Sequence, residues 1–247
     1  MAKRISSDRN AIVKEIIFIA DLFKEHYHGG GESNDFALIQ YLQSQGYTVN
    51  KVFCRDVNDD LVNSHKTFII GNFIQLPEKY KYKLHKKKYI IYEHDHKYLK
   101  SRDPSVYPDF IAPSHEIINE TFYKNAYAVV VLSNICKEII KANLQLDNVY
   151  NIGCSLWTNE KINYISSLSD AEKNKAYAVL HSLNPVKGYS QAVDYCNKNN
   201  IKFDIIEPCG ANELLTQLVR YRVLVFFPQV LETFCRLAAE AKMLNCQ

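Results

Sequence analysis

Four segments of the chain place polar or glycine residues where chemistry could occur. The first is Tyr27-His28-Gly29-Gly30-Gly31-Glu32, in which three glycines would let a ligand approach the backbone. The helix expected after it would favour negative charge at its N-terminus. The segment has neither the G-x-G-x-x-G spacing of dinucleotide sites nor the lysine of a P-loop. We therefore interpret it as a ligand-binding turn of another kind, the alternative being a flexible turn.

The second segment, Tyr92-Glu93-His94-Asp95-His96, ends an apolar strand abruptly with four polar side chains. Such groups are costly at a buried strand end unless they meet a ligand or each other. His94 or His96 could therefore hydrogen-bond a substrate hydroxyl, the alternative being a polar network that caps the sheet. The two histidines have no third ligand nearby in sequence, and the cysteines form no cluster, so we predict no metal site.

The third segment, Asn184-Pro185-Val186-Lys187-Gly188, carries a turn signal and opens a predicted helix. Lys187 would lie in the first turn of that helix, where a lysine opposes the helix dipole. A ligand phosphate would reverse that penalty, because the ammonium and the backbone N–H groups would share the anion. A solvated surface lysine is the alternative.

In the fourth segment seven residues separate Glu232 from Glu240, and Thr233 is a suitable N-cap for the helix that contains Glu240. Eight positions cover just over two helical turns, so both carboxylates can face one end of a sheet. One could accept hydrogen bonds from sugar hydroxyls and the other from ribose hydroxyls.

Short β-branched and aromatic runs must position these segments. They are nearly continuous in Val, Ile, Phe and Tyr, which is typical of parallel strands buried on both faces. The predicted strands are Glu15–Ala20, Thr48–Phe53, Thr67–Ile70, Tyr89–Tyr92, Ala128–Leu132, Val149–Ile152, Ala176–Leu180, Phe203–Ile206 and Val223–Phe227. The predicted helices are Glu32–Gln45, Pro77–His85, His115–Lys124, Asn134–Asn143, Lys187–Asn197, Ala211–Arg220 and Thr233–Leu244. This alternation predicts an α/β fold with open parallel sheets.

A polar, Ser-rich stretch at Ser166–Asp170 indicates a domain boundary near residue 170. Residues 1–170 would form a Rossmann-like domain with six strands. Residues 171–247 would form a second Rossmann-like domain with only three strands, which we expect to be incomplete.

The composition is that of an ordinary globular protein, with 47% hydrophobic and 23% charged residues. The net charge of +3 is too small to indicate a nucleic-acid partner, and we interpret the lysine-rich run at Lys79–Lys88 as a solvated helix face. No apolar run approaches the roughly 18 residues of a membrane span. The seven scattered cysteines favour reduced thiols and a cytoplasmic location.

Taken in order, the four segments resemble those of GT-B type retaining glycosyltransferases of the family 4 class. Gly29–Glu32 is similar to their G-G-x-E segment, and the pair of His94 and Asp95 to their strand-end H-D. Asn184–Gly188 is similar to their K-G phosphate segment, and Glu232–Glu240 to their E-x7-E signature. Tyr92–Lys100 and Asn151–Trp157 also resemble glycosyltransferases encoded by large viruses and phages.

The resemblance implies two Rossmann-like domains that face a cleft. It implies transfer of a sugar from a nucleotide-diphosphate sugar to a hydroxyl of a glycan or another acceptor, with retention and without metal or cofactor. The implied catalytic residues are His94 and Glu232. The implied sugar-donor residues are Gly30, Gly31, Lys187 at the diphosphate, Glu232 at the sugar hydroxyls, Thr233 and Phe234 through backbone N–H groups, and Glu240 at the ribose. Glu32, Asp95 and His96 would lie on the acceptor side.

Two departures from the family pattern bear on activity. Many relatives carry an arginine where this chain has Ser182, which would weaken stabilisation of the departing diphosphate unless Arg222, Arg236 or another residue compensates. The chain also ends seven residues after Glu240, from which we expect a truncated second domain and an open sheet edge near Gln247. The alternative function is a non-catalytic module that binds a sugar nucleotide or a glycan. A nucleotide-dependent oxidoreductase is disfavoured because G-x-G-x-x-G is missing.

Overall fold

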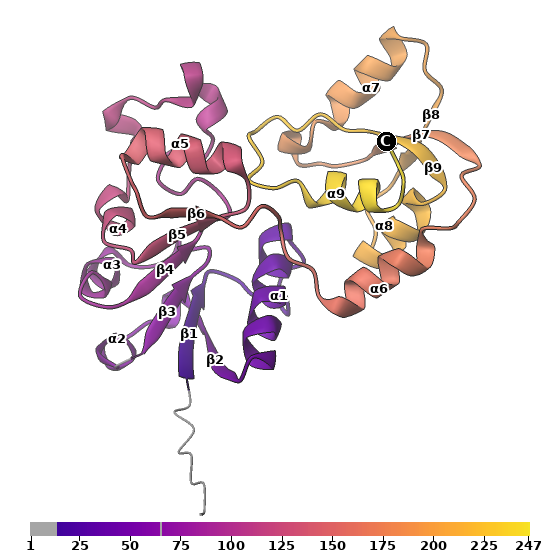
Figure 1. The fold of residues 1–247 in the computed structure, drawn as a ribbon. Helices are drawn as coiled ribbons and strands as arrows, with labels where there is room; N and C mark the ends of the chain where they lie inside the picture. Colours follow the sequence, from indigo (N-terminus) through magenta and orange to yellow (C-terminus); the bar gives the residue numbers. More distant parts are fainter. Residues whose placement is uncertain (1–13, 65) are drawn as a thin grey trace, which may run out of the picture.

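The computed structural model describes residues 14–64 and 66–247. They form two parallel β-sheets that lie side by side, each with its own helices (Figure 1). The first sheet has the order β2-β1-β3-β4-β5-β6. Its strands are β1 (Lys14–Ala20), β2 (Tyr47–Phe53), β3 (Thr67–Ile70), β4 (Tyr89–Tyr92), β5 (Ala128–Val131) and β6 (Val149–Asn151).

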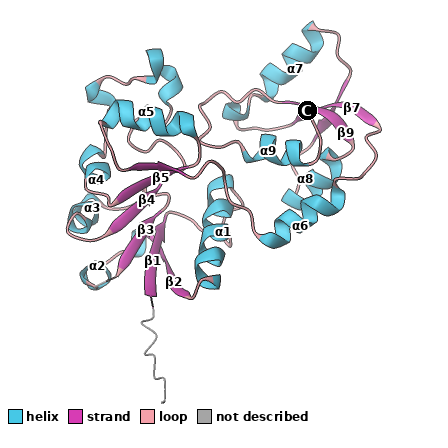
Figure 2. Cartoon of the chain, viewed as in Figure 1, coloured by secondary structure: helices cyan, strands magenta, loops and turns pink. Residues whose placement is uncertain are grey.

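Helices cover both faces of the first sheet, which explains why its strands are apolar throughout (Figure 2). α1 (Gly30–Ser44) packs through Ile39 on the face that carries Phe18. The opposite face, which carries Ile17 and Ile19, is covered by α2 (Asp59–Asn63), α3 (Glu78–Leu84), α4 (Glu120–Lys124) and α5 (Asn134–Leu144).

The second sheet has the order β8-β7-β9, built from β7 (Lys175–Leu180), β8 (Phe203–Ile206) and β9 (Tyr221–Val225). One face packs on α6 (Asn159–Leu168), α8 (Ala211–Leu218) and α9 (Arg236–Met243), and the other on α7 (Tyr189–Lys198). Gln247 lies beside β9, where its N–H donates to Arg222 O and its carbonyl accepts from Leu224 N, both at 2.8 Å. Gln247 therefore pairs with β9 through the two hydrogen bonds of a single parallel β-bridge.

The expected α/β architecture with two parallel sheets is confirmed, and each predicted strand is found to within two residues of its predicted ends. The predicted helix His115–Lys124 is wrong in its first half. Asn119 adopts a left-handed backbone with φ 56°, so α4 begins only at Glu120. Ser114–Glu116 form a separate 3-10 turn. A helix that was not predicted, α6, precedes and overlaps the Ser-rich stretch, and it packs through Ile165 on the second sheet.

Two further local predictions are wrong at helix starts. Lys187 lies in a 3-10 turn, Pro185–Lys187, and not in the first turn of α7, because Gly188 interrupts the helix with φ 64°. Thr233 does not cap α9, whose N-cap is Cys235. The hydroxyl of Thr233 instead donates to the carbonyl of His94 at 2.8 Å. This bond joins the two halves of the molecule, the first half being the part that carries the six-stranded sheet and the second half the part that carries the three-stranded sheet.

We expect Gly188→Ala to destabilise the protein by more than the about 1–3 kcal/mol that an unfavourable backbone conformation costs. A Cβ at this position would have a left-handed backbone and would also collide with the carbonyl of Phe227. Gly153 is the matched control, since its φ is 81° but nothing lies within 4 Å of an added Cβ. Thermal unfolding of Gly188→Ala and Gly153→Ala separates the cost of the left-handed backbone from the cost of the collision with Phe227. Equal losses of stability in the two variants would show that the Phe227 contact is irrelevant.

Candidate functional site

A cleft of about 220 Å³ lies where the carboxyl ends of the two sheets face each other. In each sheet the strand order reverses, between β1 and β3 and between β7 and β9, and open parallel sheets bind ligands at such points. The first half contributes Gly30, Gly31, Glu32, Asn34, Asn72, His94, Asp95, Leu132 and Ser155 to the lining. The second half contributes Lys187, Glu232, Thr233, Phe234 and Arg236.

The structure thus brings most of the sequence-predicted site residues into one place. Those that line the cleft are Gly30, Gly31, Glu32, His94, Asp95, Lys187, Glu232, Thr233 and Phe234. Two predicted residues, His96 and Glu240, are not in the lining. The segment that precedes α9 crosses from the second half to the first, which carries Glu232 and Thr233 to the end of β4 (Figure 1).

His94 follows the end of β4 and is held by Asp35, whose Oδ1 lies 2.6 Å from the ring Nε2. The side chains are 6% and 3% exposed, respectively. Because a carboxylate only accepts hydrogen bonds, the pairing places the ring proton on Nε2. Gly31 packs against the ring, 3.7 Å from where its Cβ would be. In the described residues no hydrogen bond occupies Nδ1, so this nitrogen remains available to a ligand in the cleft.

A buried ion pair supports the His94–Asp95 loop from behind. Lys97 Nζ donates to Glu93 Oε1 at 2.6 Å, and neither side chain is exposed at all. Burial acts to raise the pKa of Glu93, but Lys97, the Tyr123 hydroxyl and the N–H of Asp95 together hold this pKa below its usual range. The loop is therefore anchored at both of its ends.

His96 turns away from the cleft because its backbone is left-handed, with φ 49°. Its ring is buried, with Nε2 3.7 Å from Cys136 Sγ and Nδ1 3.3 Å from the Tyr98 hydroxyl. Burial lowers the pKa of His96 to about 4 and raises that of Cys136 to about 11. The pair is therefore neutral and packs beneath the carbonyl of Thr233.

We expect stability to fall by about 3 kcal/mol on account of His96 as the pH drops from about 6.5 to about 4. The unfolded histidine takes up a proton near its ordinary pKa, whereas the folded one resists until about 4, so acid favours the unfolded chain. His96→Asn tolerates the left-handed backbone and cannot titrate. Urea unfolding at several pH values should give a flatter profile for this variant. Glu32 and Asp95, whose pKa values burial raises, oppose the trend but are common to both proteins. If the free energy of unfolding of the wild type and of His96→Asn changed with pH in parallel, His96 would not be the residue that causes the loss of stability in acid.

The second wall of the cleft carries a partly exposed ion pair, with Lys187 Nζ 2.8 Å from Glu232 Oε1. Asn184 positions the lysine by accepting a hydrogen bond from Val186 N–H at 3.1 Å in the 3-10 turn. Without a ligand the two groups therefore neutralise each other. An anion at Lys187 would release the Glu232 carboxylate for hydroxyl groups.

Besides Lys187, the cation Arg236 lines the cleft, whereas Ser182 carries no charge and Arg222 is exposed on β9. The Arg236 guanidinium donates to Ser155 Oγ and to Leu156 O, both at 2.6 Å. The guanidinium also lies 4.4 Å from the ring centre of Trp157.

Glu240 lies one layer behind the cleft. Its Oε1 accepts from Trp157 Nε1 at 2.8 Å and lies 3.6 Å from Arg236 Nη2. Contact with a ribose would require this carboxylate to leave its partners, so its predicted role stays a prediction.

Sequence reasoning missed four polar residues of the first half, which are Asn34, Asp35, Asn72 and Ser155. Asn34 accepts hydrogen bonds from Ser155 Oγ and Leu156 N–H and so links α1 to the segment between the sheets. Asp35 orients His94, and Asn72 lines the cleft. The position of Asn72, two residues after the end of β3, was a usable signal, since polar residues near a strand end are the pattern that identified His94.

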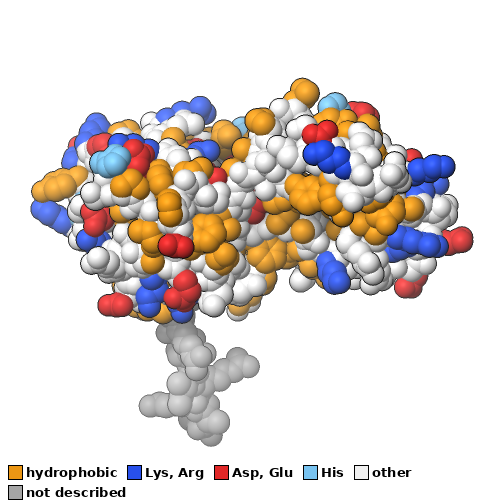
Figure 3. Space-filling model, turned by 90° about the horizontal axis from the view of Figure 1, so that it is seen from above, with side chains coloured by type: hydrophobic (Ala, Val, Ile, Leu, Met, Phe, Trp, Pro, Cys, Tyr) orange, Lys and Arg blue, Asp and Glu red, His pale blue; other side chains and the backbone are white. Residues whose placement is uncertain are grey.

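Residues 14–64 and 66–247 contain no group of three His, Cys, Asp or Glu side chains arranged to hold a metal ion. None of the helices described is both long and apolar enough to cross a membrane. Basic and acidic side chains are intermixed over the face shown in Figure 3 and gather on no one part of it.

Two solved structures share this architecture. HepE of Anabaena, in complex with UDP and glucose, is 12% identical, and the match covers 94% of this chain and 79% of that chain with a TM-score of 0.55. A glycosyltransferase of Rickettsia africae is 12% identical, covering 95% of this chain and 78% of that chain with a TM-score of 0.56. The chain has a GT-B fold.

At this level of identity the likeness concerns the GT-B fold alone. No family model matches the sequence, and no curated protein matches it.

Proposed function

We propose that the protein is a glycosyltransferase that moves a sugar from a nucleotide-diphosphate sugar to an acceptor hydroxyl. The observation that carries the proposal is the cleft itself, where Lys187 and Glu232 on one wall face His94 on the other. An ammonium for a diphosphate and a carboxylate for sugar hydroxyls are the groups that a sugar nucleotide requires. The complex of HepE with UDP and glucose supports this class of sugar donor.

In the proposed reaction the diphosphate displaces Glu232 from Lys187, and the freed carboxylate accepts hydrogen bonds from the sugar. Lys187 and Arg236 then stabilise the negative charge that develops on the departing diphosphate. The cleft of about 220 Å³ is smaller than the about 300–1,000 Å³ of most ligand sites, so binding must also widen it.

We further propose that the transfer retains the anomeric configuration and requires neither metal nor cofactor, as the family 4 resemblance implies. His94 would then contact the transferred sugar through Nδ1, with Asp35 fixing the ring. A specific observation favours inversion as a second candidate. A buried carboxylate paired with a histidine is also the arrangement of a general base that removes the proton of an attacking hydroxyl.

Thermal shifts with UDP, GDP, ADP and their sugars test the proposal. A ligand at 100 times its Kd stabilises the folded state by about 2.7 kcal/mol, so one nucleotide should raise Tm clearly. Proton NMR of the product then reads the anomeric configuration and decides between retention and inversion. No shift with any diphosphate would refute the proposal, and a shift without consumption of any sugar nucleotide would select the binding module.

A further inference from the structure

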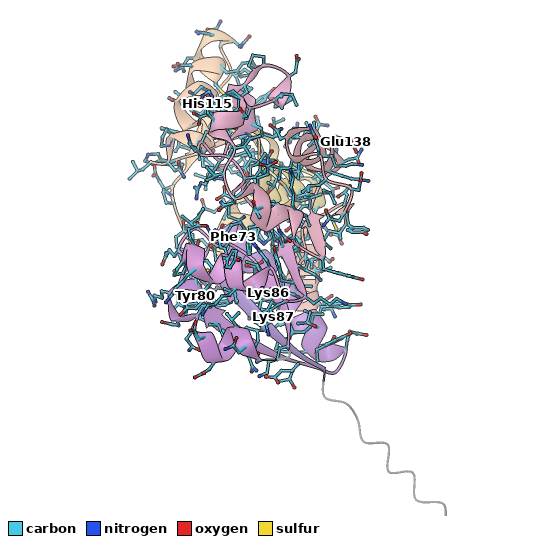
Figure 4. All side chains as sticks on the ribbon, turned by 90° about the vertical axis from the view of Figure 1, so that its left-hand side faces the viewer. Phe73, Tyr80, Lys86, Lys87, His115 and Glu138 are labelled. Atoms are coloured by element: carbon cyan, nitrogen blue, oxygen red, sulfur yellow. The ribbon has the colours of Figure 1, made fainter. Side chains whose placement is uncertain are left out.

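The positive charge of the protein is concentrated in one short segment away from the cleft. Residues 78–88 hold six lysines and one glutamate, a formal charge of +5, whereas the whole chain carries +3. The rest of the chain is therefore net negative. None of the six lysines lines the cleft. The segment comprises α3 and the turn that leads into β4, on the side of the first half that faces away from the second half (Figure 1, Figure 4).

α3 has one buried side and one exposed side. The buried residues are Tyr80, Lys81 and Leu84. The outer side chains stand three or four positions apart, which places them along one face of a helix. They are Lys79, Tyr82, Lys83 and Lys86. Lys87 and Lys88 continue this row to the start of β4, where Lys88 lies beside Tyr127. We call these seven residues, from Lys79 to Lys88 with Tyr127, the lysine face.

Most of the charge on the lysine face is not neutralised within the described residues. Asp59 pairs with Lys83 at 2.8 Å, and Glu78 pairs with the buried Lys81. In residues 14–64 and 66–247 no ion pair involves the other four lysines, which are Lys79, Lys86, Lys87 and Lys88. Neighbouring like charges repel one another, and a negatively charged partner would relieve this repulsion.

Two exposed tyrosines lie among these lysines and indicate the kind of partner. Tyr82 is 68% exposed and Tyr127 is 63% exposed. Lys88 Nζ lies 4.1 Å from the ring centre of Tyr127. Tyrosine combines an apolar ring with a polar tip and is enriched at membrane–water interfaces. The lysine face contains no arginine, the residue whose planar guanidinium is typical of nucleic-acid recognition. Lysine together with tyrosine therefore favours a lipid surface over a nucleic acid.

We propose that the lysine face binds the surface of membranes that contain anionic lipids. Clusters of four to eight basic residues on one face bind acidic headgroups, and each residue near the surface strengthens binding about fivefold. The cleft lies between the two halves, so a protein bound through the outer side of the first half keeps its cleft accessible (Figure 1). The inference does not depend on the proposed glycosyl transfer, because the two surfaces share no residue.

The test compares two triple variants that remove the same charge from different places. The first replaces three unpaired lysines of the lysine face with glutamine, namely Lys79, Lys86 and Lys88. The matched control replaces three exposed lysines of the second half with glutamine, namely Lys198, Lys202 and Lys242. Lys87 is kept in both variants, because its Nζ donates to Asn63 O at 3.3 Å and so contributes to the fold. Thermal unfolding verifies that both variants are folded.

Binding is measured by co-sedimentation with vesicles of phosphatidylcholine alone and of phosphatidylcholine mixed with phosphatidylserine, each at low and at high salt. A duplex DNA without lipid, followed by fluorescence anisotropy, is the competing probe. Tyr82→Ala tests the aromatic contribution separately from the charge.

We expect the wild type to bind the mixed vesicles, to ignore phosphatidylcholine alone, and to dissociate at high salt because salt screens the attraction. The triple variant of the lysine face should lose about 100-fold in affinity, and the control should lose little. Tyr82→Ala should weaken binding severalfold. Equal binding to both kinds of vesicle, or equal losses in the two triple variants, would overturn the inference. Tighter binding to the duplex than to the mixed vesicles would also overturn it and would identify a nucleic-acid surface instead.

Discussion

Lys97→Met is expected to lower the free energy of unfolding by about 3–5 kcal/mol. The substitution leaves the Glu93 carboxylate fully buried without its cation, and only the Tyr123 hydroxyl and the N–H of Asp95 still donate to it. Lys97 Nζ also lies 5.3 Å from the ring centre of Phe73, which is buried inside the first half (Figure 4). Methionine keeps the apolar part of this contact, so the loss reports the ion pair.

Chemical denaturation of Lys97→Met and of the double variant Glu93→Gln, Lys97→Met measures this effect. The double variant removes both charges, and we expect it to recover much of the loss because glutamine can still accept from Tyr123. A single variant as stable as the wild type would show that Glu93 is protonated in the folded protein. Such a result would contradict the lowered pKa of Glu93.

Lys187→Met is expected to reduce kcat/KM about 100- to 1,000-fold, the range found when one preorganised charge-stabilising group is removed. The side chain is 41% exposed and its pair with Glu232 is weak, so the fold should be unaffected. The effect should therefore fall on catalysis and on nucleotide binding.

Lys202→Met is the matched control for Lys187→Met, because this lysine is exposed in the same half of the molecule. Release of nucleoside diphosphate gives the rate, and thermal shift with the nucleotide gives the affinity. Equal activity of the two variants would exclude Lys187 from the site.

The strands could be predicted because burial on both faces demands a run such as Ile16–Ala20, which no surface element would carry. α6 could not, because its exposed faces are polar and only Ile165 is fully buried, with Tyr164 and Leu168 partly buried beside it. The helix start near residue 115 was missed because the left-handed backbone of Asn119 depends on its tertiary contacts. One of these is the bond from Asn119 Nδ2 to Lys97 O at 2.7 Å.

The cleft residues were predictable where they follow strands, since the ends of parallel strands meet at one edge of a sheet. On this basis His94, Lys187 and Glu232 were correctly expected to lie together. It could not foresee that the backbone of His96 would turn its ring inward, or that Glu240 would be held by Trp157. Those outcomes depend on contacts between segments that are far apart in the sequence.

Trp157 is the only tryptophan of the 247 residues. Its indole N–H is bound by Glu240 and its ring lies beneath the guanidinium of Arg236, which itself reaches the cleft. Indole fluorescence responds to charges and hydrogen bonds at the ring. A nucleotide that draws Arg236 or Glu240 toward itself will therefore change the emission of one defined fluorophore. The protein thus contains its own optical reporter, and binding of ligands to the cleft can be followed in real time without a label.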